Sequence, residues 1–204
     1  MITLVRNRII LLACCAVPLA AGATTYEVDV SHAEIGFSIR HMGISNVRGS
    51  FRTFSGTITY DGSDILTLRA TAEIEVDSID TGNGKRDDHL LDHDFFDAAK
   101  YPKITFSSTG VKMSPDGHLL TGKLTMHGLT KEISLVMNVS GPIEDPWGNK
   151  RIGLELEGGL NRHDFGVGNS GSSDKLLGKN VVLSIGLEGI AVKEGPVTMP
   201  VPQK

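Results

Sequence analysis

Residues 65–77 read ILTLRATAEIEVD, and this stretch decides the fold class of the chain. Apolar residues stand at every second position from Leu66 to Val76, with threonine, arginine and glutamate between them. Successive side chains of a strand point to opposite faces, so this alternation predicts one long, half-buried β-strand. The same alternation returns in three later stretches, at 133–139, 152–156 and 181–187.

Turn residues such as Asp61-Gly62 and Gly141-Pro142 separate these runs. The first predicted strand is interrupted near Ser31. Long strands joined by short turns favour an antiparallel meander, and closing it into a barrel removes exposed edges. We therefore expect an all-β fold, an eight-stranded antiparallel barrel. The predicted strands lie near 26–42, 47–60, 65–77, 103–113, 118–128, 131–144, 149–162 and 179–192.

One segment departs from the strand pattern, from Asn83 to Lys100. It combines acidic residues with apolar ones such as Leu90 and Phe95, and Asn83 is a suitable N-cap. We expect a short helical insertion near 83–100, acidic on its outer face and apolar toward the barrel.

The first 23 residues have the layout of a secretory signal peptide. Arg6 and Arg8 precede an apolar run, and Ala21-Gly22-Ala23 is a cleavage signal of small residues. The apolar run is too short for a membrane span of roughly 30 Å. The predicted organisation is a removed signal peptide at 1–23, a barrel domain at 24–193 and a flexible tail at 194–204. The exported product would be periplasmic.

A second interpretation of this leader stays open. Leu11-Leu12-Ala13-Cys14 resembles a lipobox, in which Cys14 would be acylated. The apolar run continues past Cys14, which favours cleavage after Ala23 instead. Both cysteines, Cys14 and Cys15, lie in the leader, so that cleavage would leave no thiol for disulfides, metal binding or catalysis.

Net charge excludes a basic footprint for nucleic acid. The whole chain has a formal charge of −4, and loss of Arg6 and Arg8 takes it to −6. Both signs are mixed along the sequence, and such a surface suits a soluble protein and not one held on anionic lipid headgroups.

Six stretches together resemble the YceI-like family of polyisoprenoid-binding proteins, in order and over essentially all of residues 26–190. They are 26–32, 35–42, 49–51, 88–106, 122–130 and 161–166. The resemblance implies a lipocalin-like periplasmic barrel with a long isoprenoid in a central tunnel, homodimers in some members and no established catalytic residue. The chain departs from the family at Tyr26, where tryptophan is usual, and at Ala33, where serine is usual.

Strand parity assigns an apolar inner face to the barrel. Small residues on it, among them Ala70, Ala72, Gly122, Gly128 and Gly158, favour a cavity over a packed interior. The predicted tunnel lining consists of Phe37, Ile39, Leu68, Ala70, Ala72, Ile74, Phe106, Met126, Leu135, Met137, Leu154, Leu156, Leu183 and Ile185.

Three polar residues share the inward parity near one end. His41, Arg162 and Asp164 form a predicted collar for a ligand headgroup, since a guanidinium suits phosphate. The structural alternative stays open: Arg162 and Asp164 pair with each other and plug the barrel, and His41 is a satisfied interior histidine.

Asp88, His89, Asp92, His93 and Asp94 have the residue types of a metal site. No third nitrogen or sulfur ligand stands at a useful spacing, so we expect a solvated acidic helix face, no metal and no cofactor besides a bound lipid. His127 and His163 are expected outside the barrel.

The best-supported function is non-catalytic binding, storage or transport of a long isoprenoid-type lipid, with a prenyl phosphate or quinone-like headgroup. Two alternatives are an eight-stranded outer-membrane barrel and a lipid-modifying enzyme. One tryptophan and three tyrosines are too few for two aromatic girdles. No acid and base pair has a credible spacing for catalysis. The sequence leaves the lipid unidentified.

Overall fold

The computed structural model describes residues 22–115, 117–169 and 173–193. The predicted signal peptide and the predicted tail lie outside this range, apart from Gly22 and Ala23. The strands are β1 (Thr24–Val28), β2 (Glu34–His41), β3 (Ser45–Phe51), β4 (Phe54–Tyr60), β5 (Arg69–Glu75), β6 (Ile79–Asp80), β7 (Lys103–Ser114), β8 (Gly117–Met126), β9 (Leu129–Glu144), β10 (Lys150–Asn161) and β11 (Leu177–Ala191). The helices are α1 (Gly84–Leu91) and α2 (Ser173–Leu176), with 3-10 turns η1 (Val30–His32), η2 (Ile65–Thr67), η3 (Val76–Ser78) and η4 (Arg162–Phe165).

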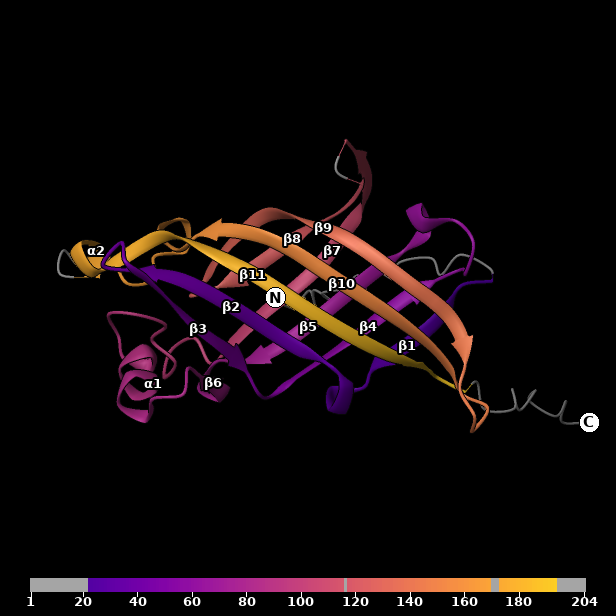
Figure 1. Ribbon diagram of the computed structural model, residues 1–204, viewed down its shortest axis with the longest axis horizontal. Coiled ribbons are helices and arrows are strands. Elements are labelled where there is room, and N and C mark those ends of the chain that lie inside the picture. The colour runs from indigo at the N-terminus through magenta and orange to yellow at the C-terminus, as the bar shows by residue number, and fades with distance from the viewer. Residues whose placement is uncertain (1–21, 116, 170–172, 194–204) are drawn as a thin grey trace, which may run out of the picture.

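A closed antiparallel barrel is the architecture of the chain, as predicted (Figure 1). The ring runs β1-β4-β5-β7-β8-β9-β10-β11 and closes where β11 pairs with β1, at Ala191 and Tyr26. β2, β3 and β6 continue the sheet beside the first half of β11, where Val181 pairs with Ile39. β1 with β2, β3 with β4 and β5 with β6 are therefore three long strands, each broken once.

The break in the first strand lies where the sequence predicted it. η1 interrupts the strand at Val30–His32, and the Asp29 carboxylate caps it by accepting from the backbone N–H of Ser31 at 3.1 Å. An aspartate side chain that binds nearby backbone offers the chain an alternative to the sheet ladder. The first strand can therefore leave β4 and turn onto β3.

The stretch at 65–77 forms a shorter strand than expected. β5 covers Arg69–Glu75 and is flanked by η2 and η3. Asp64 caps η2 through the N–H of Leu66, which leaves Leu66 exposed instead of inward. The alternation holds from Leu68 onward, because only there is the backbone extended.

The helical insertion is confirmed. α1 begins after Asn83, whose side chain accepts from the backbone N–H of Arg86 at 3.2 Å. Its apolar residues Leu90 and Leu91, with Phe95 beyond its end, pack against the barrel. Within the described residues, no helix is long and apolar enough to cross a membrane.

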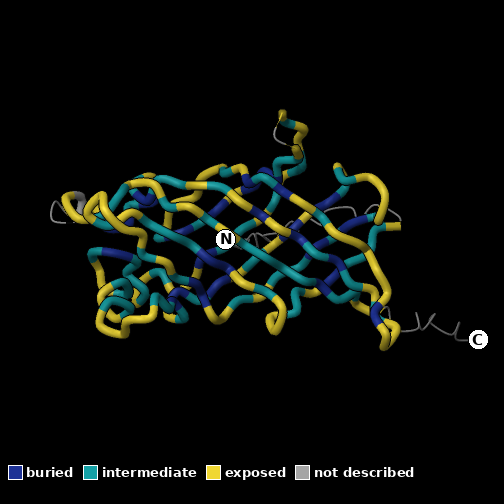
Figure 2. The backbone as a smooth tube through the Cα atoms, viewed as in Figure 1, coloured by how far each residue is buried: buried dark blue, intermediate teal, exposed yellow. Residues whose placement is uncertain are grey.

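Two apolar clusters divide the barrel interior along its length. Buried stretches of backbone occur in both halves of the barrel (Figure 2). The closed-end cluster consists of Tyr26, Ile58, Tyr60, Leu68, Ala70, Leu120, Leu135, Met137, Ile152, Leu154 and Leu156. The open-end cluster, on the side of α1, consists of Ile35, Phe51, Ile74, Val76, Ile79, Phe95, Ile104, Leu124, Met126, Phe165 and Val167.

Candidate functional site

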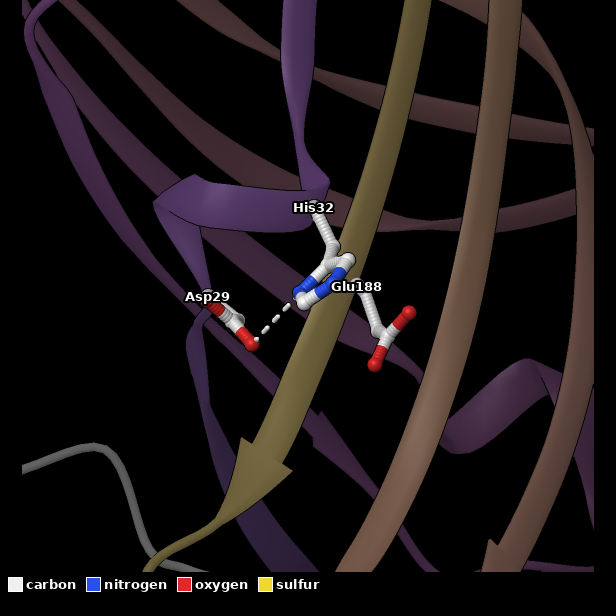
Figure 3. A group of neighbouring side chains, drawn as sticks. All are labelled: Asp29, His32 and Glu188. Carbon is white, nitrogen blue, oxygen red and sulfur yellow. Dashed lines mark hydrogen bonds and ion pairs between the residues drawn. The ribbon is translucent and has the colours of Figure 1, made fainter. Parts of the chain in front are cut away.

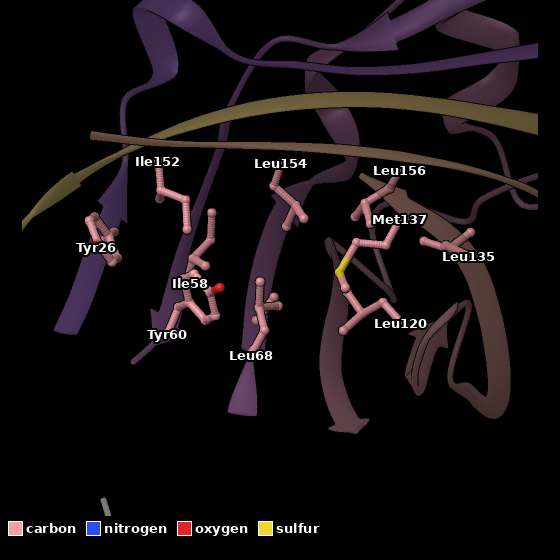
Figure 4. Close-up of a cluster of buried hydrophobic side chains, with 11 residues drawn as sticks. Tyr26, Ile58, Tyr60, Leu68, Leu120, Leu135, Met137, Ile152, Leu154 and Leu156 are labelled. Carbon is pink, nitrogen blue, oxygen red and sulfur yellow. The ribbon is translucent and has the colours of Figure 1, made fainter. Parts of the chain in front are cut away.

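The closed end of the barrel is filled by its own side chains. Leu68, Leu120 and Leu154 are each 0% exposed. Side chains from β10 meet those from β4 and β8, and that of Leu68 just before β5, across the interior (Figure 4). Six of the predicted lining residues belong to this packed cluster: Leu68, Ala70, Leu135, Met137, Leu154 and Leu156. These six point inward as expected, and they form core at this end.

The inner wall toward the other end is less covered. Ile185 pairs with Leu156 and with Ile35, so all three face the interior, yet Ile185 is only half-buried while its two partners are buried. An inward side chain that keeps exposed surface is not fully covered by the side chains around it. The other half-buried lining residues are Phe37, Ile39, Ala72, Phe106 and Leu183, whereas Ile74 and Met126 are buried in the open-end cluster.

The glycines do not supply this space. A Cβ on Gly158 would lie 2.6 Å from Cδ2 of Leu135, and one on Gly122 would overlap the ring of Phe106. Gly128 is in the β8–β9 turn with a φ of +74° instead of on the inner face. The expectation that glycines leave a cavity is wrong here, because neighbouring side chains occupy the volume above the bare backbone.

The barrel wall opens between β9 and β10. Their last paired residues are Val136 and Glu157, although β10 stays paired with β11 as far as Asn161. A hollow of about 490 Å³ lies along this opening. Its lining is Ile133, Leu160 and Phe165 from the interior, with Gly159, Ser134 and the polar residues Lys131, Glu132, Asn161 and Asp164. No predicted feature corresponds to this opening; the two consecutive glycines, Gly158 and Gly159, within a strand were the available signal.

The predicted collar is partly assembled. Arg162 is buried and binds main-chain carbonyls: its Nε donates to Gly178 at 2.9 Å, and its Nη1 to Val167 at 3.0 Å and to Gly168. Its Nη2 lies 3.4 Å from the carbonyl of Leu177. Arg162 therefore joins the turn after η4 to the start of β11.

Asp164 is exposed and lies at the rim of the hollow. The prediction that Asp164 points inward is wrong because the chain leaves the strand before it. Asn161 caps η4 there, and its side chain accepts from the backbone N–H of His163 at 3.0 Å. In the described part of the chain, no ion pair joins Asp164 to Arg162, so the predicted plug is not formed. His41 is half-buried at the end of β2, paired with Leu177, which places it at the same end as Arg162.

Two clusters have metal-ligand residue types. His89, Asp92 and Asp94 bring possible ligand atoms within 4.8 Å of one another, with His89 Nε2 at 3.3 Å from an Asp94 oxygen. His89 and Asp92 are exposed, as expected for a solvated helix face. His93 is outside the cluster. The prediction that no metal binds stays a prediction.

The second cluster, Asp29, His32 and Glu188, lies on the outer wall (Figure 3). The Arg151 guanidinium binds Asp29 at 3.0 Å and also binds Glu188, so it already supplies the positive charge. The hydrogen bond from His32, followed by that from Arg151, lowers the pKa of Asp29 to about 2. Arg151 also holds the pKa of Asp145 well below its usual value, through a 2.7 Å ion pair. This network ties β1, β10 and β11 together.

Comparisons with known proteins agree with this architecture. Residues 26–189 match the model of the YceI-like domain. Protein YceI of Escherichia coli O17:K52:H18 is 40% identical over 150 residues, covering 72% of this chain and 78% of that protein. The crystal structure of the Campylobacter jejuni YCEI protein aligns with a TM-score of 0.66 at 33% identity, covering 76% of this chain and 90% of that one.

A more distant structure shares the fold. It is a polyisoprenoid binding domain from Saccharophagus degradans, with a TM-score of 0.65 at 17% identity, covering 83% of this chain and 99% of that chain. The matched family model spans the barrel from β1 into β11, and the identity to Protein YceI extends over most of both proteins. The chain belongs to the YceI-like family.

Proposed function

We propose that this chain is an exported, non-catalytic carrier or reservoir for a long-chain isoprenoid-type lipid, held in the open half of the barrel. The observation that carries the proposal is the row of half-buried apolar side chains that face inward toward the open end, such as Phe37, Ile39 and Ile185. The Saccharophagus degradans protein of the same fold is a polyisoprenoid binding domain, which supports this class of ligand.

Apolar burial would supply the affinity. Each buried CH₂ contributes roughly 0.8 kcal/mol, so a tail of about twenty carbons gives roughly 16 kcal/mol before costs. That gross value is near the practical ceiling for non-covalent binding, and ordering the chain offsets much of it. Binding should therefore depend on the length of the tail that the open half accommodates.

The headgroup would lie at the hollow between β9 and β10. Lys131 and Asn161 stand at its rim with hydrogen-bond donors, and Ile133 and Leu160 connect the rim to the interior. A prenyl phosphate or a quinone-like oxygen would then lie at the surface, with the tail inside. His41 and Asp164 remain candidate headgroup contacts, while the carbonyl contacts of Arg162 favour a structural role.

The distribution of polar residues disfavours an outer-membrane barrel. The inner face is apolar, and outward positions of the same strands carry exposed charges such as Arg69, Glu73 and Glu155. A membrane barrel requires the reverse, an apolar band facing lipid. We also propose export through a leader that is cleaved after Ala23. An intact mass that includes a lipid adduct on Cys14 would show that Cys14 is acylated instead. Homodimer formation also stays a prediction.

Filling the proposed space tests the carrier function. In Ile39→Trp the added ring should occupy the open half, so the lipid that co-purifies, measured by native mass spectrometry and extraction, should fall by about tenfold or more. Stability should change by less than about 1 kcal/mol, since Ile39 belongs to neither packed cluster.

The matched control is Val182→Trp, an outward and exposed position on the neighbouring β11. This variant should keep its lipid. The carrier proposal is wrong if wild-type protein from cells holds no lipid, or if Ile39→Trp retains the wild-type amount.

A further inference from the structure

An exposed apolar tip projects from the open end of the barrel. The β2–β3 hairpin places Met42 and Ile44 at 56% and 78% exposure, and Leu176 of α2 lies beside them at 47%. The backbone N–H of Met42 donates to the carbonyl of Leu176 at 2.6 Å, which joins the two segments. Figure 1 shows the hairpin and α2 together at the left end, far from the C-terminal end of β11. We call Met42, Ile44 and Leu176 the hairpin patch.

Met42 stands in a conformation that favours other residues. Its φ is +51° and that of Gly43 is +72°, and Ile44 donates to the carbonyl of His41, as in a type I′ turn. Asparagine, aspartate and glycine are preferred at the first central position of this turn. A methionine there is strained and, with most of its surface in water, gains little packing in return.

The β8–β9 turn provides an internal comparison. His127 has the same φ of +51° and is followed by Gly128, but its side chain has structural partners. Its Nδ1 lies 3.1 Å from the carbonyl oxygen of Phe165, and its ring packs edge-on against Tyr101 at 4.7 Å. These contacts account for His127, which is half-buried instead of outside as parity predicted. Among the described residues, no such contact stabilises the Met42 side chain. Methionine therefore breaks the residue preference of this turn without a compensating gain in stability.

Basic residues surround the hairpin patch. Arg40 and Arg48 are exposed on β2 and β3, and Lys175 and Lys179 are exposed on α2 and at the start of β11. Exposed acidic residues of this end, such as Asp88, Asp92, Glu132 and Asp164, lie on α1, on the loop after it, on β9 and on η4, and the sequence of α2 also contains Asp174. α1 is on the opposite side of this end from α2 in Figure 1. The four cations outnumber the one aspartate of α2, so the patch is an apolar tip with an excess of positive charge near it, on a chain of negative net charge.

The hairpin patch is also continuous with the less covered inner wall. His41 and Ile39, directly before the tip, are half-buried and face the interior. We propose that the hairpin patch docks on the surface of an anionic bilayer, so that the open half of the barrel meets the membrane where its lipid enters and leaves. This inference rests on the proposed carrier function.

The chemistry of the hairpin patch suits the surface of an anionic bilayer. Two or three apolar side chains can enter the headgroup region, and four nearby cations are attracted to anionic lipids. Such contacts give weak, reversible binding, as a carrier that must leave the membrane requires. The attraction between the rim and the headgroups should decline as salt shortens the Debye length.

Flotation with vesicles tests the docking proposal. Protein purified from cells in its processed form is mixed with vesicles of phosphatidylethanolamine and phosphatidylglycerol, or with vesicles of phosphatidylcholine alone. Wild-type protein should float with the anionic vesicles and much less with the neutral ones. Ile44→Glu should lower the anionic-vesicle partition by about tenfold, from the loss of one buried apolar side chain and the gain of a negative charge.

Met42→Asn separates docking from folding. Because asparagine suits the turn, this variant should be at least as stable as wild type while its vesicle partition falls severalfold. The matched control is Ile143→Glu, because Ile143 is exposed at 64% on the β9–β10 hairpin at the closed end, beside the exposed Trp147. Its partition should not change.

Lipid content by native mass spectrometry distinguishes the two proposals. If Ile44→Glu keeps its lipid but loses vesicle binding, both stand. Absence of lipid from wild-type protein defeats the carrier function alone. The docking proposal is overturned if wild type ignores anionic vesicles, if Ile44→Glu and Met42→Asn float as wild type does, or if Ile143→Glu lowers binding equally, which would indicate the opposite end or a protein partner.

Discussion

The two ends of the barrel are held together in different ways. At the closed end, apolar side chains such as Ile152 and Leu154 fill the interior. At the open end, the inner wall keeps half-buried residues such as Ile39, and the turn after η4 is fixed by one buried arginine that binds main-chain carbonyls. Apolar packing needs the volume that a ligand would use, whereas hydrogen bonds at the rim do not. The barrel can therefore be ordered at an end that is not filled.

The largest expected effect is at the arginine of the open end. Arg162→Leu leaves four main-chain carbonyls, two buried and two partly buried, without their donor, and at about 1 kcal/mol for each lost hydrogen bond the variant should be destabilised by about 4 kcal/mol. Urea denaturation measures the loss. Arg48→Leu, an exposed arginine of the same end, is the control and should be nearly neutral. Equal stabilities for Arg162→Leu and wild type would mean that these carbonyls do not order the open end.

A matched pair of truncations tests the difference in packing directly. Ile152→Ala, at a position 1% exposed in the closed-end cluster, should cost about 3 kcal/mol through lost burial and a new cavity. Ile39→Ala removes the same atoms from a half-buried position of the open half and should cost about 1 kcal/mol. Both values come from denaturation of lipid-free protein. Costs that agree within error would show that the two halves are packed alike.

The smallest effect concerns acid stability of the network around Arg151. Asp29 has a folded pKa of about 2, below its unfolded value, so its contribution is present above about pH 4 and is lost as the pH falls toward 2. Arg151→Gln removes part of that contribution, and the folded and unfolded pKa values of Asp29 approach each other. Far-UV circular dichroism should show an acid unfolding midpoint higher by on the order of half a pH unit.

Arg52→Gln provides the comparison from the open half. It breaks an exposed pair with Asp80, and exposed pairs contribute little, so the acid midpoint should not move measurably. If both substitutions shift the midpoint equally, the Arg151 network is no more than a surface ion pair.

Much of the fold was predictable because the alternation along strands is a direct consequence of burial on one face. The run from Leu68 to Val76 carries that signal, and Asn83 marks the start of α1 by its capping chemistry. The prediction failed where a side chain redirected the backbone. Asp64 turned residues 65–67 into η2, and Asn161 ended β10 so that Asp164 left the inner face. Beyond such a cap, the alternation along the strand no longer predicts whether a side chain points inward or outward.

The candidate site was predictable only as a set of inward residues. The alternation along each strand predicted which side chains face the interior. Whether Leu154 or Ile185 has a neighbour across the barrel depends on the residues opposite, and these are set by strand register and sheet curvature. The glycine interpretation failed for the same reason, because Phe106 comes from another strand to cover Gly122.

The separation of β9 from β10 affects how the wall can move. Most wall residues are hydrogen-bonded on both sides, so displacing them breaks ladder bonds, but beyond Val136 and Glu157 each strand is bonded on one side. Outward bending of these two strand ends disrupts side-chain contacts and leaves every ladder bond intact. The wall is therefore compliant at this seam, and widening it can admit a bulky or branched hydrocarbon while the far end keeps its shape.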